Sequence, residues 1–170
     1  MSAAASTRNE IFEILDGVKD PEVPVLSVVE LGIVRDVRLD GDAVTVTLTP
    51  TYSGCPAMRV IEEDITAALV ERGLGPVRIE TVYAPAWTTD WLTDDAKRKL
   101  EAYGIAPPGR AAQETLVSLT RAPSTGAAAP RCPYCHSRDT LIKSEFGSTA
   151  CKSICYCSAC HQPFEMFKAI

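Results

Sequence analysis

Four cysteines near the end of the chain have the spacing of a metal site. Cys132 pairs with Cys135 and Cys157 pairs with Cys160, each as C-x-x-C. Each pair can place two thiolates on one side of a tight turn, and two facing turns make the tetrahedral four-sulfur cage that Zn²⁺ prefers. Because a closed shell leaves no position for water, we expect a structural zinc. Iron in the same cage stays an alternative, and four ordinary buried thiols are a less favoured one.

Cys55 stands apart from the other cysteines, between Gly54 and Pro56. The pattern predicts a loop over residues 50–56 and then a helix with Pro56 at its first position. Amide groups at a helix start stabilise an anion, so we expect a lowered pKa for the Cys55 thiol and a good nucleophile or soft-metal ligand. A small apolar side chain packed under the helix explains the residue equally well.

Two carboxylates and a tryptophan are further candidate residues. Asp20 and Glu22 flank a proline and could ligate a hard metal or contact a partner, although residues so placed are more often turn formers or solvated charges. Trp87 shares a loop with Trp91, where a ring clamps the loop as often as it contacts a partner.

The other residues with reactive side chains lie in the last third of the chain. His136 and His161 each follow the second cysteine of a pair, and we interpret them as surface residues because four sulfurs complete the shell. Cys151 and Cys155 could exchange into the site, but packing is favoured. With no P-loop and no histidine outside this segment, an enzyme would have to work through Cys55 and carboxylates.

Charge and composition exclude several classes of protein. The 170-residue chain has a net charge of −5, divided into −7 for residues 1–130 and +2 for residues 131–170. An acidic body does not suit a phosphate backbone, so nucleic-acid binding is only weakly supported. An odd number of cysteines, seven, argues against a disulfide framework. The sequence has neither a signal-like start nor an apolar run near the ~20 residues of a membrane span, so we expect no membrane contact and a reducing cytoplasm.

The pattern predicts an α+β protein: a small α/β domain with a three-stranded sheet and helices, followed by a zinc ribbon. A capping box at Thr7 and Glu10 starts a helix that runs to Asp20–Pro21. In the first strand, Ile33, Val37 and Leu39 should share a face with Arg35. We expect domains over 1–106 and 131–170 and a linker over 107–130. The expected elements are strands over 33–39, 43–49 and 77–82, helices over 56–73 and 93–103, a short strand over 115–119, and ribbon strands over 141–146, 154–156 and 163–167.

Several segments together resemble known families. Residues 20–36 (DPEVPVLSVVELGIVRD) and 49–56 (TPTYSGCP) resemble the two motifs of the small α/β domain of SufT and the cytosolic iron–sulfur targeting factors. With residues 87–91 (WTTDW), 103–108 (YGIAPP), 146–152 (FGSTACK) and 163–164 (PF), nearly the full chain resembles the PaaD family, accessory proteins of the bacterial phenylacetyl-CoA epoxidase system.

The resemblance implies an accessory factor rather than an enzyme, which assembles or delivers an iron–sulfur cluster in aerobic phenylacetate degradation. It implies that Cys55 is the functional thiol, that Asp20 and Glu22 form an acidic motif, and that the four ribbon cysteines bind the metal. Cys151 lies within one of the matched motifs, so the resemblance favours a functional role for it more than its spacing alone does. Cys155 stands where the family commonly has an aromatic residue. The implied client is the epoxidase reductase component, with a transient iron–sulfur cluster as cargo; a homodimer stays open. The rival functions are a structural subunit of the epoxidase complex, a thiol enzyme and a nucleic-acid-binding ribbon.

Overall fold

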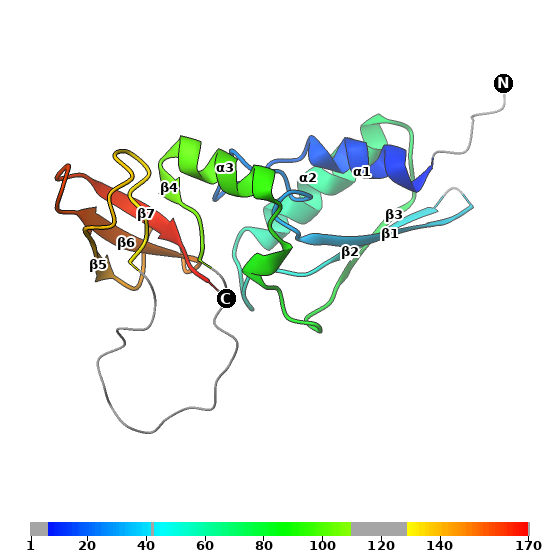
Figure 1. The fold of residues 1–170 in the computed structure, drawn as a ribbon. Coiled ribbons are helices and arrows are strands. Elements are labelled where there is room, and N and C mark those ends of the chain that lie inside the picture. Colours follow the sequence, from blue (N-terminus) through cyan, green and yellow to red (C-terminus); the bar gives the residue numbers. More distant parts are fainter. Residues whose placement is uncertain (1–6, 42, 110–128, 170) are drawn as a thin grey trace. The chain divides into compact units, whose positions relative to one another are not determined.

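The computed structural model describes residues 7–41, 43–109 and 129–169 (Figure 1). They divide into two compact units, residues 1–87 with 91–96 and residues 88–90 with 97–170, so that the division falls within α3. In chain order the elements are α1 (Arg8–Asp16), β1 (Val34–Asp40), β2 (Ala43–Leu48), α2 (Met58–Glu71), β3 (Val77–Thr81), the 3-10 turn η1 (Thr89–Trp91), α3 (Asp94–Tyr103), β4 (Ile105–Ala106), β5 (Thr140–Ser144), β6 (Lys152–Cys157) and β7 (Pro163–Phe167).

The first unit is a three-stranded sheet in the order β1-β2-β3, with α1 and α2 over one face (Figure 1). Strands β1 and β2 are antiparallel, while β2 and β3 are parallel and joined by α2. Alternate residues of β2 point into the core, and both helices bury one stripe each, as their periodicity predicts. The fully buried side chains of these three elements are Ile11, Leu15, Val44, Val46, Leu48, Ile61, Ile65 and Leu69.

The start of α1 confirms the predicted capping box, but its end is earlier than predicted. The Thr7 hydroxyl accepts from the Glu10 amide at 3.3 Å, and the Thr7 amide donates to the Glu10 carboxylate at 2.6 Å. The helix stops at Asp16 rather than at Asp20, because the following residues leave it to form an antiparallel bridge between Lys19 and Ser27. A tertiary pairing, not the proline, therefore ends the helix.

Strand β1 contains a bulge that the alternation of residue types did not predict. Its register with β2 shifts between Val34 and Asp36, so that Val34 and Val37 are both buried. The predicted face is therefore wrong for Arg35 and Leu39, which are exposed. The bulge directs Arg35 outward, and its guanidinium carbon lies 3.5 Å from the centroid of the Trp91 ring, a cation–π contact.

Both tryptophans hold the loop before β1. The Trp87 indole is buried and donates to the Leu31 carbonyl at 2.9 Å. The next residue, Gly32, has φ +73°, and a Cβ there would lie 3.0 Å from the Trp91 Cβ. Only glycine combines that backbone conformation with so close an approach.

The second unit carries the ribbon, a four-stranded sheet in the order β4-β7-β6-β5. The three predicted ribbon strands are present as β5, β6 and β7, and successive pairs are antiparallel. Strand β4, which the sequence did not predict, pairs in parallel with β7, so the ribbon sheet includes Ile105 and Ala106. The predicted strand over 115–119 and most of the predicted linker lie outside the described residues. Within the described residues, no helix has the length and apolar character needed to cross a membrane.

The packing around Gly32 gives a prediction about stability. We expect Gly32→Ala to lower the free energy of unfolding by about 2 kcal/mol, because a left-handed non-glycine residue costs about 1–2 kcal/mol and the new methyl group must also displace Trp91. The measurement is urea unfolding followed by tryptophan fluorescence, since Trp87 and Trp91 are the only tryptophans and both lie in this unit.

The matched control is Gly41→Ala. Gly41 has φ +60°, but its Cβ would meet nothing within 4 Å, so this variant carries the backbone cost alone. If both variants lose the same free energy of unfolding, the contact with Trp91 does not contribute to stability.

Candidate functional site

The two C-x-x-C turns have the same backbone geometry. In each, the amide of the fifth residue donates to the carbonyl of the first cysteine at 2.9 Å, from His136 to Cys132 and from His161 to Cys157. His136 and His161 both have positive φ, 60° and 58°. This left-handed residue turns the chain back after the second cysteine, so both thiols of a pair point to one side.

The four sulfurs converge on one point. The Sγ atoms of Cys132, Cys135, Cys157 and Cys160 all lie within 4.8 Å of one another. The Cys132–Cys160 sulfurs are 3.7 Å apart, and the Cys135–Cys157 sulfurs are 3.5 Å apart. A tetrahedral ion with metal–sulfur bonds of about 2.3 Å needs sulfur–sulfur distances of about 3.8 Å. The four thiols thus form a metal site of the predicted composition and of tetrahedral size.

The cysteines of the four-sulfur group differ in burial. Cys132 and Cys157 are fully buried, while Cys135 is exposed. Burial opposes ionisation of Cys157, but the amides of Cys160 and Ala159 and the Cys135 thiol stabilise its sulfur and bring its pKa to about 7. The thiolate that a metal requires is therefore supported by the turn itself.

The remaining cysteines of the ribbon lie outside the four-sulfur group. Cys155 is fully buried, and burial first, then the Glu145 carboxylate, raises the pKa of its thiol to about 11. It packs beside Cys132 and Cys157 in the small apolar core of the ribbon. Cys151 is buried too, with its sulfur 3.0 Å from the Thr149 hydroxyl. Both positions agree with the packing interpretation.

The two histidines point to groups other than the metal site. His136 Nδ1 is 3.3 Å from the Glu101 carboxylate, and His161 Nδ1 is 3.2 Å from the Tyr156 hydroxyl. Both side chains are exposed, which agrees with their interpretation as surface residues.

Cys55 lies in a turn and not at a helix start. Helix α2 begins at Met58 with Ala57 as its N-cap, two residues later than predicted. The Cys55 amide donates to the Tyr52 carbonyl at 3.4 Å, and the Met58 amide donates to the Cys55 carbonyl at 3.3 Å. The preceding Gly54 has φ +83° and open space around it, and the thiol is half-buried.

The expected lowering of the Cys55 pKa is wrong. Burial raises the pKa of the thiol, and the carboxylates of Glu22 and Asp20 raise it further. The Ala57 amide and the Tyr52 side chain oppose this rise without overcoming it. The sequence did not reveal Tyr52 as a neighbour of the sulfur, although its place three residues earlier in a tight loop is a signal for such a contact.

In the structure the carboxylates of Asp20 and Glu22 lie near the Cys55 thiol, and Asp20 also stabilises a turn. Asp20 is buried, and its Oδ1 accepts from the amides of Glu22 at 2.8 Å and Val23 at 2.7 Å. It is therefore a turn former, and the half-buried Glu22 is the carboxylate with the larger electrostatic effect on Cys55. Trp87 is buried against Leu31, which favours the interpretation that its ring clamps a loop.

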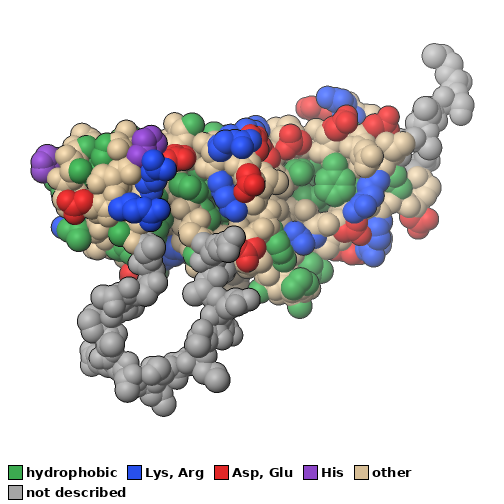
Figure 2. Space-filling model, in the orientation of Figure 1, with side chains coloured by type: hydrophobic (Ala, Val, Ile, Leu, Met, Phe, Trp, Pro, Cys, Tyr) green, Lys and Arg blue, Asp and Glu red, His purple; other side chains and the backbone are tan. Residues whose placement is uncertain are grey.

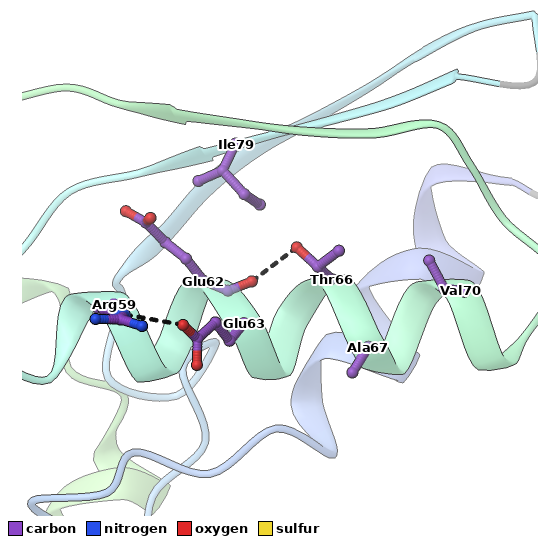
Figure 3. Close-up of a pocket in the computed structure, with 7 residues that line it drawn as sticks. All are labelled: Arg59, Glu62, Glu63, Thr66, Ala67, Val70 and Ile79. Atoms are coloured by element: carbon purple, nitrogen blue, oxygen red, sulfur yellow. Dashed lines mark hydrogen bonds and ion pairs between the residues drawn. The ribbon is translucent and has the colours of Figure 1, made fainter.

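A shallow depression follows the outer side of α2 and the edge of β3 (Figure 3). Two local contacts stiffen it: Arg59 pairs with Glu63 at 2.9 Å, and the Thr66 hydroxyl donates to the Glu62 carbonyl at 2.8 Å. Neither Cys55 nor a ribbon cysteine lines it, so it is separate from both thiol sites. Its lining residues are Arg59, Glu62, Glu63, Thr66, Ala67, Val70 and Ile79.

Comparison with known proteins finds relatives for both parts of the chain. Residues 8–82 match the iron–sulfur cluster assembly protein family, and residues 118–168 match the PaaD zinc beta ribbon domain. A protein of Escherichia coli (strain K12), named provisionally as a component of 1,2-phenylacetyl-CoA epoxidase, is 43% identical over 163 residues, which is 95% of this chain and 93% of that protein. The chain belongs to the PaaD family. The resemblance seen in the sequence is thereby confirmed.

Shorter relatives match the first part of this PaaD-family chain alone. The Fe-S protein maturation auxiliary factor of Porphyromonas gingivalis (strain ATCC BAA-308 / W83) is 35% identical over 96 residues, 55% of this chain and 90% of that protein. The factor YitW of Bacillus subtilis (strain 168), with the same description, is 35% identical over 92 residues, 53% of this chain and 89% of that protein. Iron–sulfur protein maturation is therefore the role that the names of these relatives share.

Solved structures confirm the predicted fold of the same part. A domain of unknown function DUF59 from Bacillus anthracis is 29% identical with a TM-score of 0.52, and it covers 55% of this chain and 90% of its own. The conserved hypothetical protein TM0487 from Thermotoga maritima is 29% identical with a TM-score of 0.50. The match covers 58% of this chain and 98% of that protein. The α+β domain followed by a cysteine-bearing ribbon is the predicted fold class.

The four-thiol geometry predicts one tightly held metal ion per chain. We expect Cys135→Ser to lose more than half of the metal and the order of the ribbon, because the small core of the ribbon contains two of the other ligands. Elemental analysis of the purified protein is the measurement. Cys151→Ser, which alters a buried thiol outside the group, is the control and should keep its metal. Less than about half an equivalent of metal in the unaltered protein would count against the site.

The environment of Cys55 predicts slow alkylation at neutral pH that accelerates as the pH rises. Replacing the Glu22 carboxylate with an amide removes a nearby negative charge and lowers the thiol pKa. We expect Glu22→Gln to react with iodoacetamide roughly threefold faster at pH 8, because a lower pKa leaves more of the group as the reactive thiolate. Mass spectrometry of the peptide that contains Cys55 measures the rate. Glu13→Gln, an exposed carboxylate on α1, should change nothing; an unchanged rate in Glu22→Gln would contradict the electrostatic account.

Proposed function

We propose that this protein matures an iron–sulfur protein of the phenylacetyl-CoA epoxidase system, with Cys55 as the thiol that handles the cargo. The observation that carries the proposal is the joining of two modules in one chain. One resembles proteins named as Fe-S maturation auxiliary factors, and the whole resembles a protein named as a component of the epoxidase. A client within that system explains why a general maturation domain is fused to a ribbon of the PaaD type.

The surroundings of Cys55 suit a metal ligand better than a nucleophile. Burial and the carboxylates of Glu22 and Asp20 disfavour the free thiolate, so at neutral pH the group is a thiol with low intrinsic reactivity. The same negative charges stabilise a cation placed at the sulfur, and an incoming iron ion displaces the thiol proton. An iron–sulfur cluster or its iron, bound transiently as cargo, fits this arrangement, and a thiol enzyme fits it less well.

We propose Zn²⁺ as the ion of the ribbon, because four thiolates in a closed tetrahedral shell satisfy zinc without an open position. The proposed organisation keeps residues 1–106 as the iron–sulfur assembly domain, residues 107–130 as a linker and residues 131–170 as the ribbon. Strand β4, at the end of residues 1–106, pairs with β7 and belongs to the same compact unit as the ribbon. Seven reduced cysteines suit a cytoplasmic location.

A structural subunit of the epoxidase is the second candidate function. The name of the Escherichia coli relative favours it, since that name describes a constituent of the epoxidase rather than a maturation factor. A structural subunit would remain in a fixed ratio with the other components through purification, whereas a maturation factor would leave its client once the cluster is in place.

The decisive experiment measures the cluster of the client. We expect the epoxidase reductase component, purified from cells that lack this protein or carry Cys55→Ala, to lose most of its iron and acid-labile sulfide. Ser53→Ala, at an exposed position of the same loop, should support normal loading. Ribbon metal should be unchanged in both variants, because Cys55 lies outside the four-sulfur group. Full iron and sulfide in a client matured with Cys55→Ala would overturn the proposed role of the thiol.

A further inference from the structure

The ribbon sheet has an outer face that its own core does not use. Register places the buried Cys155 opposite Phe164, facing the core, so the neighbouring Ile154 and Tyr156 point to the other side of β6. On that side Leu141 lies opposite Tyr156. We define the outer-face patch as Leu141, Phe146, Ile154 and Tyr156, together with Lys143 and Lys168.

The apolar members of the patch are well exposed for a unit of this size. Leu141 is 51% exposed, Phe146 69% and Ile154 38%. They are three of the five exposed large hydrophobic residues found within residues 129–169; the other two, Tyr134 and Ile142, lie outside the patch. Clustered exposed apolar side chains mark interaction sites more often than scattered ones do.

Two lysines cover the rings of the patch. A register shift in β5 between Ile142 and Ser144 leaves Lys143 outside the ladder, and its ammonium lies 5.5 Å from the centroid of the Tyr156 ring. Lys168 lies 4.6 Å from the centroid of the Phe146 ring and also donates to the Ala150 carbonyl at 2.9 Å. Each ring thus carries a positive charge above it, so apolar area and charge are presented together.

The loop that carries Phe146 is fixed by the protein itself. The Ser144 hydroxyl accepts from the Phe146 amide at 3.2 Å and donates to its carbonyl at 2.8 Å. The next residue, Gly147, has no room for a side chain, since a Cβ would lie 2.9 Å from the Glu165 carboxylate. The backbone at Phe146 is thus held in one conformation, and the ring is exposed there, although its burial would be favourable by itself.

A buried ion pair supports the same loop from beneath. Lys152 is 4% exposed, and its ammonium pairs with the Glu165 carboxylate at 3.1 Å. The other oxygen of Glu165 accepts from the Ser148 amide at 2.8 Å. Removing Glu165 would leave the Lys152 ammonium buried without this counterion, so the ion pair favours one conformation of the loop. An exposed aromatic side chain on a fixed backbone is typical of residues that anchor a protein–protein interface.

We propose that the outer-face patch docks a partner protein through an extended segment that alternates apolar and acidic side chains. Apolar side chains of the segment would cover Phe146 and Ile154, and its carboxylates would meet the ammonium groups of Lys143 and Lys168. The charge of residues 131–170, +2, favours an acidic partner over a basic one. This inference does not depend on the iron–sulfur role.

Two other modes of binding fit the surface less well. A nucleic acid needs a row of cations along its phosphates, whereas this patch has two lysines with Glu145 beside Phe146. On the face drawn in Figure 2, basic and acidic side chains are interspersed, with no continuous basic stripe. Pairing of a partner strand with the open edge of β5 is hindered by the irregular register at Lys143.

The test uses a fluorescent peptide of about twelve residues that alternates Glu with Leu or Phe, long enough to lie along two strands. Fluorescence anisotropy with the metal-loaded full chain should show binding that is at least about tenfold tighter than that of the same peptide with Lys in place of Glu. Phe146→Ala and Lys143→Gln should each weaken binding of the acidic peptide by about five- to tenfold. Metal content checks that both variants keep the folded ribbon.

The matched control is Tyr83→Ala, which removes a ring of similar exposure, 63%, from the first unit and should leave the affinity unchanged. Equal affinity for the acidic and basic peptides would overturn the proposal, as would equal binding by Phe146→Ala and the unaltered chain. Tighter binding of a DNA duplex of about 20 base pairs at physiological salt, weakened by Lys143→Gln, would overturn it in favour of nucleic acid.

Discussion

The convergence of four sulfurs is the constraint on which the ribbon depends. Its interior holds few apolar side chains, and two of the residues in its core cluster, Cys132 and Cys157, belong to the four-sulfur group. A segment of this size cannot bury enough apolar surface to offset its conformational entropy. A metal bound by the four sulfurs would tie together two turns that lie far apart in the sequence, and the sheet from β5 to β7 keeps those turns facing each other.

The first unit places its thiol by a different principle. Cys55 has no converging sulfurs around it, and its surroundings are set by the turn at Asp20, whose carboxylate fixes the backbone at Glu22 and Val23. That turn brings negative charge to the sulfur, which disfavours a thiolate and favours a bound cation. The four sulfurs of the ribbon thus surround one closed site, whereas Cys55 is a single half-buried thiol beside two carboxylates.

Local features of the sequence predicted the local features of the structure. The capping box, the C-x-x-C turns and the alternating strand β2 each depend on neighbours within a few residues, and each is present. The early end of α1, the bulge at Arg35 and strand β4 are set by partners distant in the sequence, namely Ser27, Trp91 and β7. For the same reason the spacing of residues did not predict the burial of the Cys55 thiol or the proximity of Glu22, which together reverse the expected pKa shift.

Strand β6 links the two surfaces of the ribbon through the period of a β-strand. Cys155 and Cys157 point to the small core, where Cys157 joins the four-sulfur group, while Ile154 and Tyr156 point outward and belong to the outer-face patch. A one-residue slip of this strand would exchange the two sets, so a metal bound to Cys157 would also fix which side chains reach solvent. The metal need not touch a partner to matter for binding, because it sets the register on which the outer surface is built.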